Sequence, residues 1–194
     1  FLHRMLTQDI NGMTGGQSRR AMQLNNKGRI VADLVVHHGD LDTWLELDRF
    51  DLPALRQLLE GRLFSEDVTF EDLTDQRTVF AIHGPASIAL LNAACDAKIE
   101  TPIDKLGTHH VISIANTLLT ASRCDGCGVL GYHLFVPADH AEAVYQKLLD
   151  AAGFDAALER ELGADYAQQR REGLRGRPVG WLAYNTARIE AGSP

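Results

Sequence analysis

The segment RIVADLVVHH, residues 29–38, places one carboxylate inside an otherwise apolar run. Apart from Asp33, residues 30–36 are apolar and mostly β-branched, which predicts a strand buried on both faces. Side chains alternate along a strand, so Asp33 shares a face with Val35, whereas Ala32 points the opposite way. A charged carboxylate is costly to bury alone, so the fold has to supply a partner for Asp33.

The remaining pattern places strands in groups, with single helices between the groups. Helices are predicted to begin near Asp51, Pro85 and Asp139, and an amphipathic segment covers 178–190. Because strands and helices do not alternate regularly, the sequence predicts an α+β fold with antiparallel sheets. The predicted strands are 20–24, 29–38, 43–47, 68–73, 78–82, 110–120 and 131–137.

Composition excludes several classes of function. The net charge is −7 and basic residues form no long cluster, so no nucleic-acid partner is expected. No apolar run approaches the roughly 20 residues that cross a bilayer, so no membrane association is expected. Three cysteines are too few for a disulfide framework and favour a reducing compartment, the cytoplasm or an organelle matrix.

The cysteines and histidines give no strong sign of a metal site. Cys124 and Cys127 lie in the glycine-rich loop CDGCG, with no second pair to complete four zinc ligands, so a plain turn is expected. The doublets at 37–38 and 109–110 place their two members on opposite faces of a strand, and each is expected to mark a strand end near solvent. The residues alone therefore indicate a soluble α+β domain that binds a small molecule.

Four stretches in a fixed order give a resemblance to a known family. Together they resemble the folate-binding GcvT/YgfZ superfamily. This superfamily includes the aminomethyltransferase (T-protein) of the glycine cleavage system and YgfZ-type proteins linked to iron-sulfur cluster assembly. The stretches are FLHRMLTQDI, GGQSRRAMQLNNKGRIVADLVV, VFAIHGPASIALL, and GYHLFVPADHAEAVYQKLLDAAG closing on ARIEAGSP.

The resemblance implies a folate-binding domain built from duplicated ferredoxin-like halves, with antiparallel sheets around a channel that holds tetrahydrofolate. Residues 1–194 would then form a folate-binding region that is incomplete at both ends, with halves at about 1–75 and 76–194. The resemblance also implies that the C-terminal β-barrel domain of full-length members lies outside this chain.

The resemblance also places the site residues. The catalytic carboxylate of the transferases falls on Ala32, which leaves the catalytic residue unknown. Asp33 is the neighbouring position, and because it faces the other way it is expected to be structural, accepting hydrogen bonds from an arginine such as Arg29 or Arg188. Val129 stands where the transferases carry a glutamate that pairs with the pterin. The expected contacts to the cofactor are Arg188, Tyr132 and Asp33, with no metal.

Three functions follow from the resemblance. The favoured one is a tetrahydrofolate-binding accessory protein of the YgfZ type, acting in iron-sulfur cluster assembly or maintenance with the proteins of that process. The alternative is an aminomethyltransferase that works with a lipoyl carrier protein, and enzyme activity is left open between the two. A non-catalytic scaffold that has lost folate, with its channel plugged by Val129 and Leu130, is the third.

Overall fold

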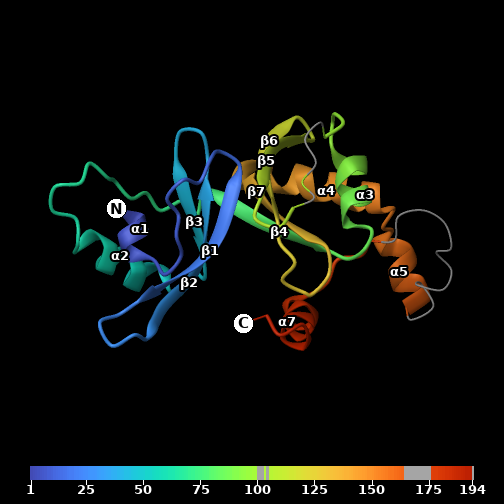
Figure 1. The fold of residues 1–194 in the computed structure, drawn as a ribbon. Helices are drawn as coiled ribbons and strands as arrows, with labels where there is room; N and C mark the ends of the chain where they lie inside the picture. The colour runs from blue at the N-terminus through green and yellow to red at the C-terminus, as the bar shows by residue number, and fades with distance from the viewer. Residues whose placement is uncertain (100–102, 104, 164–175, 194) are drawn as a thin grey trace. The chain divides into compact units, whose positions relative to one another are not determined.

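The computed structural model describes residues 1–99, 103, 105–163 and 176–193 (Figure 1). The chain divides into two units. The first contains Phe1–Asp75 and Gly107–His109, and the second contains Gln76–Leu106 and His110–Pro194. Each unit has its own antiparallel sheet and its own cluster of buried apolar side chains. This confirms the α+β fold with antiparallel sheets.

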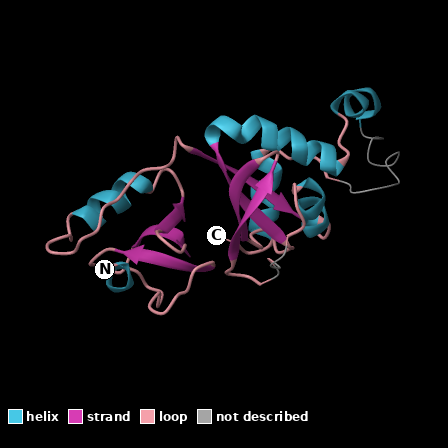
Figure 2. Ribbon diagram, turned by 90° about the horizontal axis from the view of Figure 1, so that it is seen from above, coloured by secondary structure: helices cyan, strands magenta, loops and turns pink. Residues whose placement is uncertain are grey.

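The first unit contains a three-stranded sheet in the order β1-β2-β3, with short loops between its strands. Figure 2 shows the strands in magenta and the helices in cyan. The predicted strands at 20–24, 29–38 and 43–47 are all present. The predicted helix after Asp51 ends before Gly61, as expected from the glycine there. The elements are α1 (Leu2–Met5), β1 (Gln17–Leu24), β2 (Ile30–His38), β3 (Thr43–Leu47) and α2 (Leu52–Glu60).

One face of this sheet forms the apolar core of the first unit. Ala32, Leu34 and Val36 of β2 are buried in one cluster with Leu55 and Leu59 of α2. The leucines recur at helical spacing, so a single stripe of α2 meets the sheet. Packing of this apolar face against α2 holds β2 in place within the first unit.

The prediction that β2 is buried on both faces was wrong for the face opposite α2. Val31, Asp33 and Val35 are only partly buried, whereas His37 further along the same face is fully buried. Within the first unit, the strand therefore has one apolar face against α2 and one mixed face with charged residues.

The second unit is a four-stranded antiparallel sheet in the order β4-β7-β6-β5. Helices α3 and α4 pack on each other and on β7. The elements are β4 (Arg77–His83), α3 (Ser87–Ala94), β5 (His109–Ile114), β6 (Thr117–Arg123), β7 (Gly131–Pro137), the short helix η1 (Ala138–His140), α4 (Ala141–Ala152), α5 (Ala156–Leu162) and α7 (Trp181–Glu190).

Two predicted strands were wrong. Residues 68–73 form no strand. The run 110–120 is a hairpin of β5 and β6, because Ala115 and Asn116 adopt positive φ angles of 52° and 58° and reverse the chain. Asn tolerates a positive φ angle better than most residues, so Asn116 was the signal in the sequence for a turn at this point.

The core of the second unit joins its sheet to its two central helices. Leu134 and Val136 of β7 are buried in one cluster with Leu91 of α3 and with Val144 and Leu148 of α4. In contrast, α7 has no buried residue, and Trp181 at its start is largely exposed.

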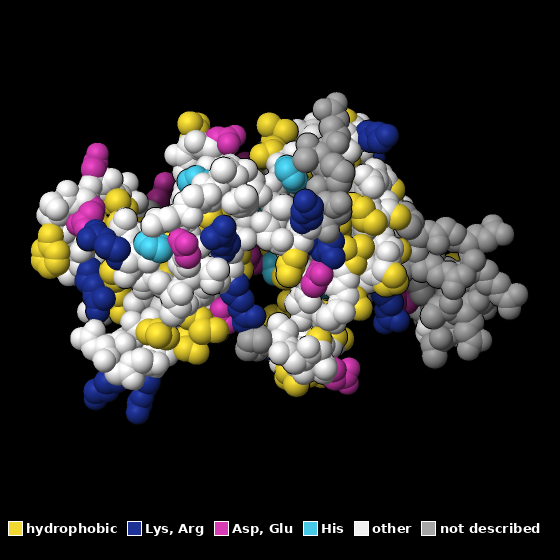
Figure 3. Space-filling model, viewed as in Figure 1, with side chains coloured by type: hydrophobic (Ala, Val, Ile, Leu, Met, Phe, Trp, Pro, Cys, Tyr) yellow, Lys and Arg dark blue, Asp and Glu magenta, His cyan; other side chains and the backbone are white. Residues whose placement is uncertain are grey.

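No described helix is both long and apolar enough to cross a membrane. On the face shown in Figure 3, basic and acidic side chains are interspersed.

Candidate functional site

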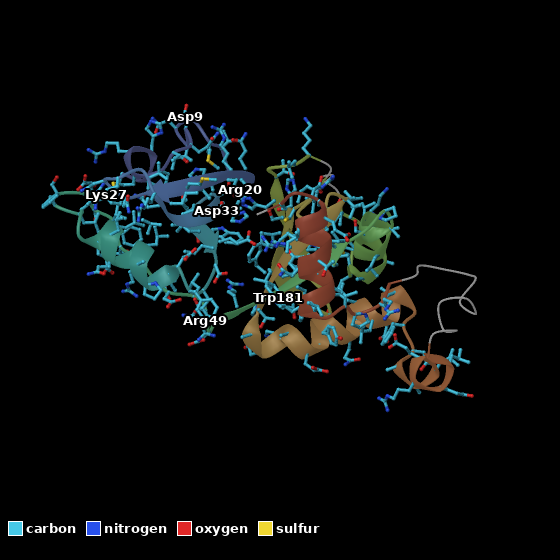
Figure 4. The ribbon with its side chains drawn as sticks, turned by 90° about the horizontal axis from the view of Figure 1, so that it is seen from below. Asp9, Arg20, Lys27, Asp33, Arg49 and Trp181 are labelled. Atoms are coloured by element: carbon cyan, nitrogen blue, oxygen red, sulfur yellow. The ribbon has the colours of Figure 1, made fainter. Side chains whose placement is uncertain are left out.

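Asp33 lies on the mixed face of the first sheet and pairs with Arg20 of β1 (Figure 4). The Arg20 Nε donates to Asp33 Oδ1 at 2.9 Å, and its Nη2 donates to Oδ2. Both carboxylate oxygens therefore accept hydrogen bonds from one guanidinium, the bidentate arrangement that Arg favours. The side chains are partly exposed, at 47% for Arg20 and 33% for Asp33.

The prediction that Asp33 accepts hydrogen bonds from an arginine is confirmed, but the partner within its unit is Arg20 and not Arg29. Arg20 lies opposite Val35 in the β1-β2 register, and Met22 lies opposite Asp33. Arg20 and Asp33 are thus diagonal neighbours on one face, within reach of a long side chain. The register, which the sequence does not state, selects the partner.

Ala32 lies on the opposite face from Asp33, as the alternation predicts. It is buried in the apolar cluster with Leu34 and the leucines of α2. A carboxylate at position 32 of this structure would be surrounded by apolar side chains, which strongly disfavours its ionised form. Asp33 therefore does not occupy the site of residue 32.

The histidine doublets were expected near solvent, and this was wrong for one member of each. His37 is 0% exposed and His109 is 5% exposed. The ring of Trp44 stacks on His37 with centroids 4.2 Å apart, and Ser18 Oγ contacts both histidines. The sequence analysis missed Ser18, Trp44 and Glu46, although strand alternation along 43–47 already places Trp44 and Glu46 on one face.

In the second unit, the glycine-rich loop between β6 and β7 is closed by a local ion pair. The Asp125 carboxylate accepts hydrogen bonds from Arg123 at 2.6 and 2.9 Å and from the Gly131 N–H at 3.2 Å. The Cys124 N–H donates to the Gly131 carbonyl at 2.9 Å. The hydrogen bond from Arg123 holds the pKa of Asp125 below its ordinary value. The loop is thus fixed at both ends.

Cys127 of this loop is a poor nucleophile in this setting. Burial, followed by the neighbouring Cys124, raises the pKa of the Cys127 thiol above its ordinary value. A raised pKa leaves little thiolate for metal binding or redox exchange at neutral pH. Within residues 1–99, 103, 105–163 and 176–193, no three His, Cys, Asp or Glu side chains are grouped to hold a metal ion.

His83 at the end of β4 lies against this loop. It faces Gly131 across the strands, and its ring centroid is 5.5 Å from that of Tyr184 in α7 and 6.1 Å from that of His133. Both ring nitrogens are buried, and neither has a hydrogen-bond partner among the described residues. Burial, followed by repulsion from His133, lowers the pKa of His83, so the ring is kept neutral.

Two expected cofactor contacts lie in this unit. Arg188 of α7 donates from Nη2 to Asn185 Oδ1 at 2.8 Å, which holds the guanidinium along its own helix. Tyr132 is buried, and its hydroxyl donates to the Ile103 carbonyl at 3.0 Å. Val129 is 43% exposed, whereas Leu130 packs partly against the core. That Arg188, Tyr132 and Asp33 contact a ligand stays a prediction.

The chain is similar to known one-carbon transferases along most of its length. A family model described as the GCVT N-terminal domain matches residues 1–160. The aminomethyltransferase of Prosthecochloris aestuarii is 25% identical, covering 100% of this chain and 48% of that protein. The sesamin methylene transferase of Sinomonas sp. strain No.22 is 28% identical, covering 90% of this chain and 37% of that protein.

A solved structure supports the fold. The glycine cleavage system aminomethyltransferase T from Bartonella henselae matches with a TM-score of 0.67 and 22% identity, covering 97% of this chain and 44% of that chain. This chain therefore spans less than half the length of these relatives. The relatives support the transferase alternative better than the accessory role in iron-sulfur cluster assembly that the sequence analysis favoured.

Proposed function

Because this chain belongs to the GCVT N-terminal domain family, we propose that it is part of a protein that transfers a one-carbon unit to tetrahydrofolate, as an aminomethyltransferase does. The observation that carries this proposal is the alignment of an aminomethyltransferase over the whole chain, through both units. The sesamin methylene transferase supports the same class of reaction, because its name also describes the movement of a one-carbon group.

The reaction sets a clear chemical requirement. Moving the carbon of an aminomethyl group from a carrier thiol to folate forms two bonds from that carbon to folate nitrogens. Two folate N–H bonds, the carbon–amine bond and the carbon–sulfur bond break. One released proton leaves on the amine as ammonia, and the other ends on the carrier thiol. The protein therefore has to bind folate, orient the donor and move protons from the folate nitrogens to the two departing groups.

Three residues are proposed as folate contacts. The Arg188 guanidinium suits a ligand carboxylate, because its fork of N–H donors matches two carboxylate oxygens. The Tyr132 ring is buried in the core cluster of the second unit, so its proposed contact with folate has the least support of the three. Asp33 offers a carboxylate on the partly exposed face of its sheet, where it also pairs with Arg20.

The accessory role remains a second candidate because of one observation. Ala32 is buried among apolar side chains and offers no group that could exchange a proton. A protein that binds folate without transferring a carbon unit would tolerate this residue. The two roles share a folate site and differ in whether ammonia is released.

The test is a calorimetric titration of the intact protein with tetrahydrofolate. We expect saturable binding at micromolar affinity, weakened at least tenfold by Arg188→Ala, a loss of about 1.4 kcal/mol. Arg160→Ala is the matched control, since Arg160 is an exposed arginine of α5 in the same unit. Absence of heat and of thermal stabilisation at millimolar ligand would overturn the folate proposal.

A transfer assay then separates the two candidates. The intact protein is mixed with tetrahydrofolate and an aminomethyl-loaded lipoyl carrier protein, and ammonia is measured. The aminomethyltransferase proposal expects ammonia release that depends on both components. Folate binding without any ammonia release would instead favour the accessory role.

A further inference from the structure

A hollow in the first unit is lined by positive charge. It has a volume of about 410 Å³ and lies between the turn that joins β1 to β2 and the end of α2. This volume falls within the range of small-molecule sites. Its lining residues are Asn25, Asn26, Lys27, Arg29, Leu58 and Arg62. We refer to this set as the basic hollow.

Hydrogen bonds fix the turn that contributes Lys27 and Arg29. The Asn25 Oδ1 accepts from the backbone N–H of Lys27 at 2.9 Å and from that of Arg29 at 3.1 Å. The Gly28 N–H donates to the Asn25 carbonyl at 2.9 Å, and Gly28 has a φ angle of 73°, which glycine adopts without strain. Asn25 thus closes the turn through its side chain and its backbone. One backbone conformation therefore sets where the side chains of Lys27 and Arg29 begin (Figure 4).

Arg62 connects the end of α2 to this turn. Its backbone N–H donates to the Leu59 carbonyl at 3.1 Å, just after the last residue of the helix. Its Nη2 donates to Asn26 Oδ1 at 3.0 Å, and these two residues are 36 positions apart in the sequence. This bond uses one N–H of the guanidinium, so its other N–H donors stay available to a ligand.

The charges of the basic hollow are not neutralised by the described residues. Lys27, Arg29 and Arg62 form no ion pair within the described part of the chain, and no acidic residue is among the described residues that line the hollow. The chain as a whole carries a net charge of −7. Three other arginines of the first unit each pair with a carboxylate, in the ion pairs Arg4–Glu66, Arg20–Asp33 and Arg56–Glu60.

Solvated surface cations are the simpler reading, because Lys27, Arg29 and Arg62 are exposed. A cation just after a helix is also favoured by the helix dipole, which accounts for Arg62. It does not account for Lys27 and Arg29, which come from a separate turn. Like charges repel, so cations that serve only solubility gain nothing from lining one concave surface. A hollow that gathers positive charge attracts anions from solution.

We propose that the basic hollow binds a small anion that carries two or more phosphate or carboxylate groups. The guanidiniums of Arg29 and Arg62 suit the paired oxygens of such groups, and the ammonium of Lys27 adds a compact charge. A long polyanion is not favoured, because the negative charge of the rest of the chain repels it. This inference does not depend on the proposed function, since no proposed folate contact lines the basic hollow.

The test is a calorimetric titration of the intact protein with pyrophosphate and, in a second arm, with citrate. Both arms use a phosphate-free buffer of low ionic strength without divalent cations. We expect saturable binding of at least one of the two anions, weakened about tenfold by Arg29→Ala and about tenfold by Arg62→Ala. The affinity is expected to fall as sodium chloride is added, because salt screens exposed charges.

Two more variants separate a built site from general charge. Arg56→Ala is the matched control, because Arg56 is an exposed arginine of α2 that pairs with Glu60 and does not line the basic hollow. It is expected to leave the affinity within about twofold. Arg62→Lys keeps the charge and loses the planar fork, so its affinity is expected to lie between those of wild type and Arg62→Ala. Thermal unfolding without ligand verifies that each variant is folded.

The two arms also identify the ligand chemistry. Binding of pyrophosphate alone supports a phosphate site, binding of citrate alone supports a carboxylate site, and binding of both supports a site for multivalent anions in general. Absence of heat and of thermal stabilisation with both anions at millimolar concentration would overturn the proposal. A loss with Arg56→Ala equal to the losses with Arg29→Ala and Arg62→Ala would also overturn it, because the binding would then follow net charge and not the hollow.

Discussion

Two histidines with buried ring nitrogens, one in each unit, occupy similar places and have opposite surroundings. His37 lies near the end of β2 directly opposite Ser18, and His83 ends β4 directly opposite Gly131. Both ring nitrogens of His37 are hydrogen-bonded. Neither ring nitrogen of His83 has a partner in the part of the chain that the structure describes.

The cross-strand residue makes this difference. A serine opposite His37 supplies a hydroxyl that can donate to one ring and accept from another. A glycine opposite His83 supplies no side chain, and the ring instead lies close to the backbone, since a Cβ on Gly131 would be 2.2 Å from His83 Nδ1. The first environment gives each ring nitrogen of His37 a hydrogen-bond partner, and the second keeps the ring of His83 neutral by desolvation. Strand register thus decides whether a buried histidine is oriented or only packed.

The largest expected effect comes from adding one methyl group opposite His83. Gly131→Ala places a Cβ 2.2 Å from His83 Nδ1 and 2.4 Å from the Cys124 carbonyl oxygen. We expect the free energy of unfolding to fall by about 3 kcal/mol, near the upper end for overpacking. Urea unfolding measures it. Gly126→Ala is the control, because its nearest contact is 3.6 Å, and an equal loss there would contradict the packing argument.

The second effect comes from removing the hydroxyl opposite His37. Ser18→Ala leaves the Nδ1 atoms of His37 and His109 without their shared contact, so we expect a loss of about 2 kcal/mol of unfolding free energy. The exposed Ser65→Ala serves as the control in the same unit. A change below about 0.5 kcal/mol would show that the contacts of Ser18 with His37 and His109 contribute little to stability.

A third variant removes one satisfied hydroxyl from the unit that contains His83. Tyr132→Phe deletes the hydrogen bond to the Ile103 carbonyl and is expected to cost about 1 kcal/mol in chemical unfolding. If Tyr132 contacts folate through its ring alone, the affinity for tetrahydrofolate stays unchanged. Weaker folate binding with unchanged stability would show that the hydroxyl serves the ligand instead.

The smallest effect is a difference in pH dependence. The pKa of His83 is lower in the folded than in the unfolded chain, so the unfolded state binds its proton more readily. Stability is therefore full above the ordinary histidine pKa of about 6.5 and falls as the pH drops below it. Thermal unfolding from pH 7.5 to 5 should show a shallower decline for His83→Asn than for wild type. Parallel curves would rule out a contribution from His83.

Local pattern allowed much of the fold to be predicted. The strands of the first unit, the helix ending before Gly61 and the strand at 131–137 follow from the period of apolar residues and from turn and capping residues. Side chains alternate along a strand, and this correctly predicted that Ala32 and Asp33 lie on opposite faces of the sheet. The strand expected at 68–73 is absent, because strand preference depends on packing against neighbouring strands and a short segment such as VTFEDL does not form a strand by itself.

The sequence by itself determined which residues form strands and helices and which neighbours share a face, since these depend on contacts a few residues apart. Only the tertiary structure decided that Asp33 pairs with Arg20. It also decided that Ser18 contacts both His37 and His109, although His109 lies 91 residues after Ser18 in the sequence. These contacts depend on strand register and on the docking of a distant segment. Many registers are compatible with the same local pattern, and packing of the whole unit selects one of them.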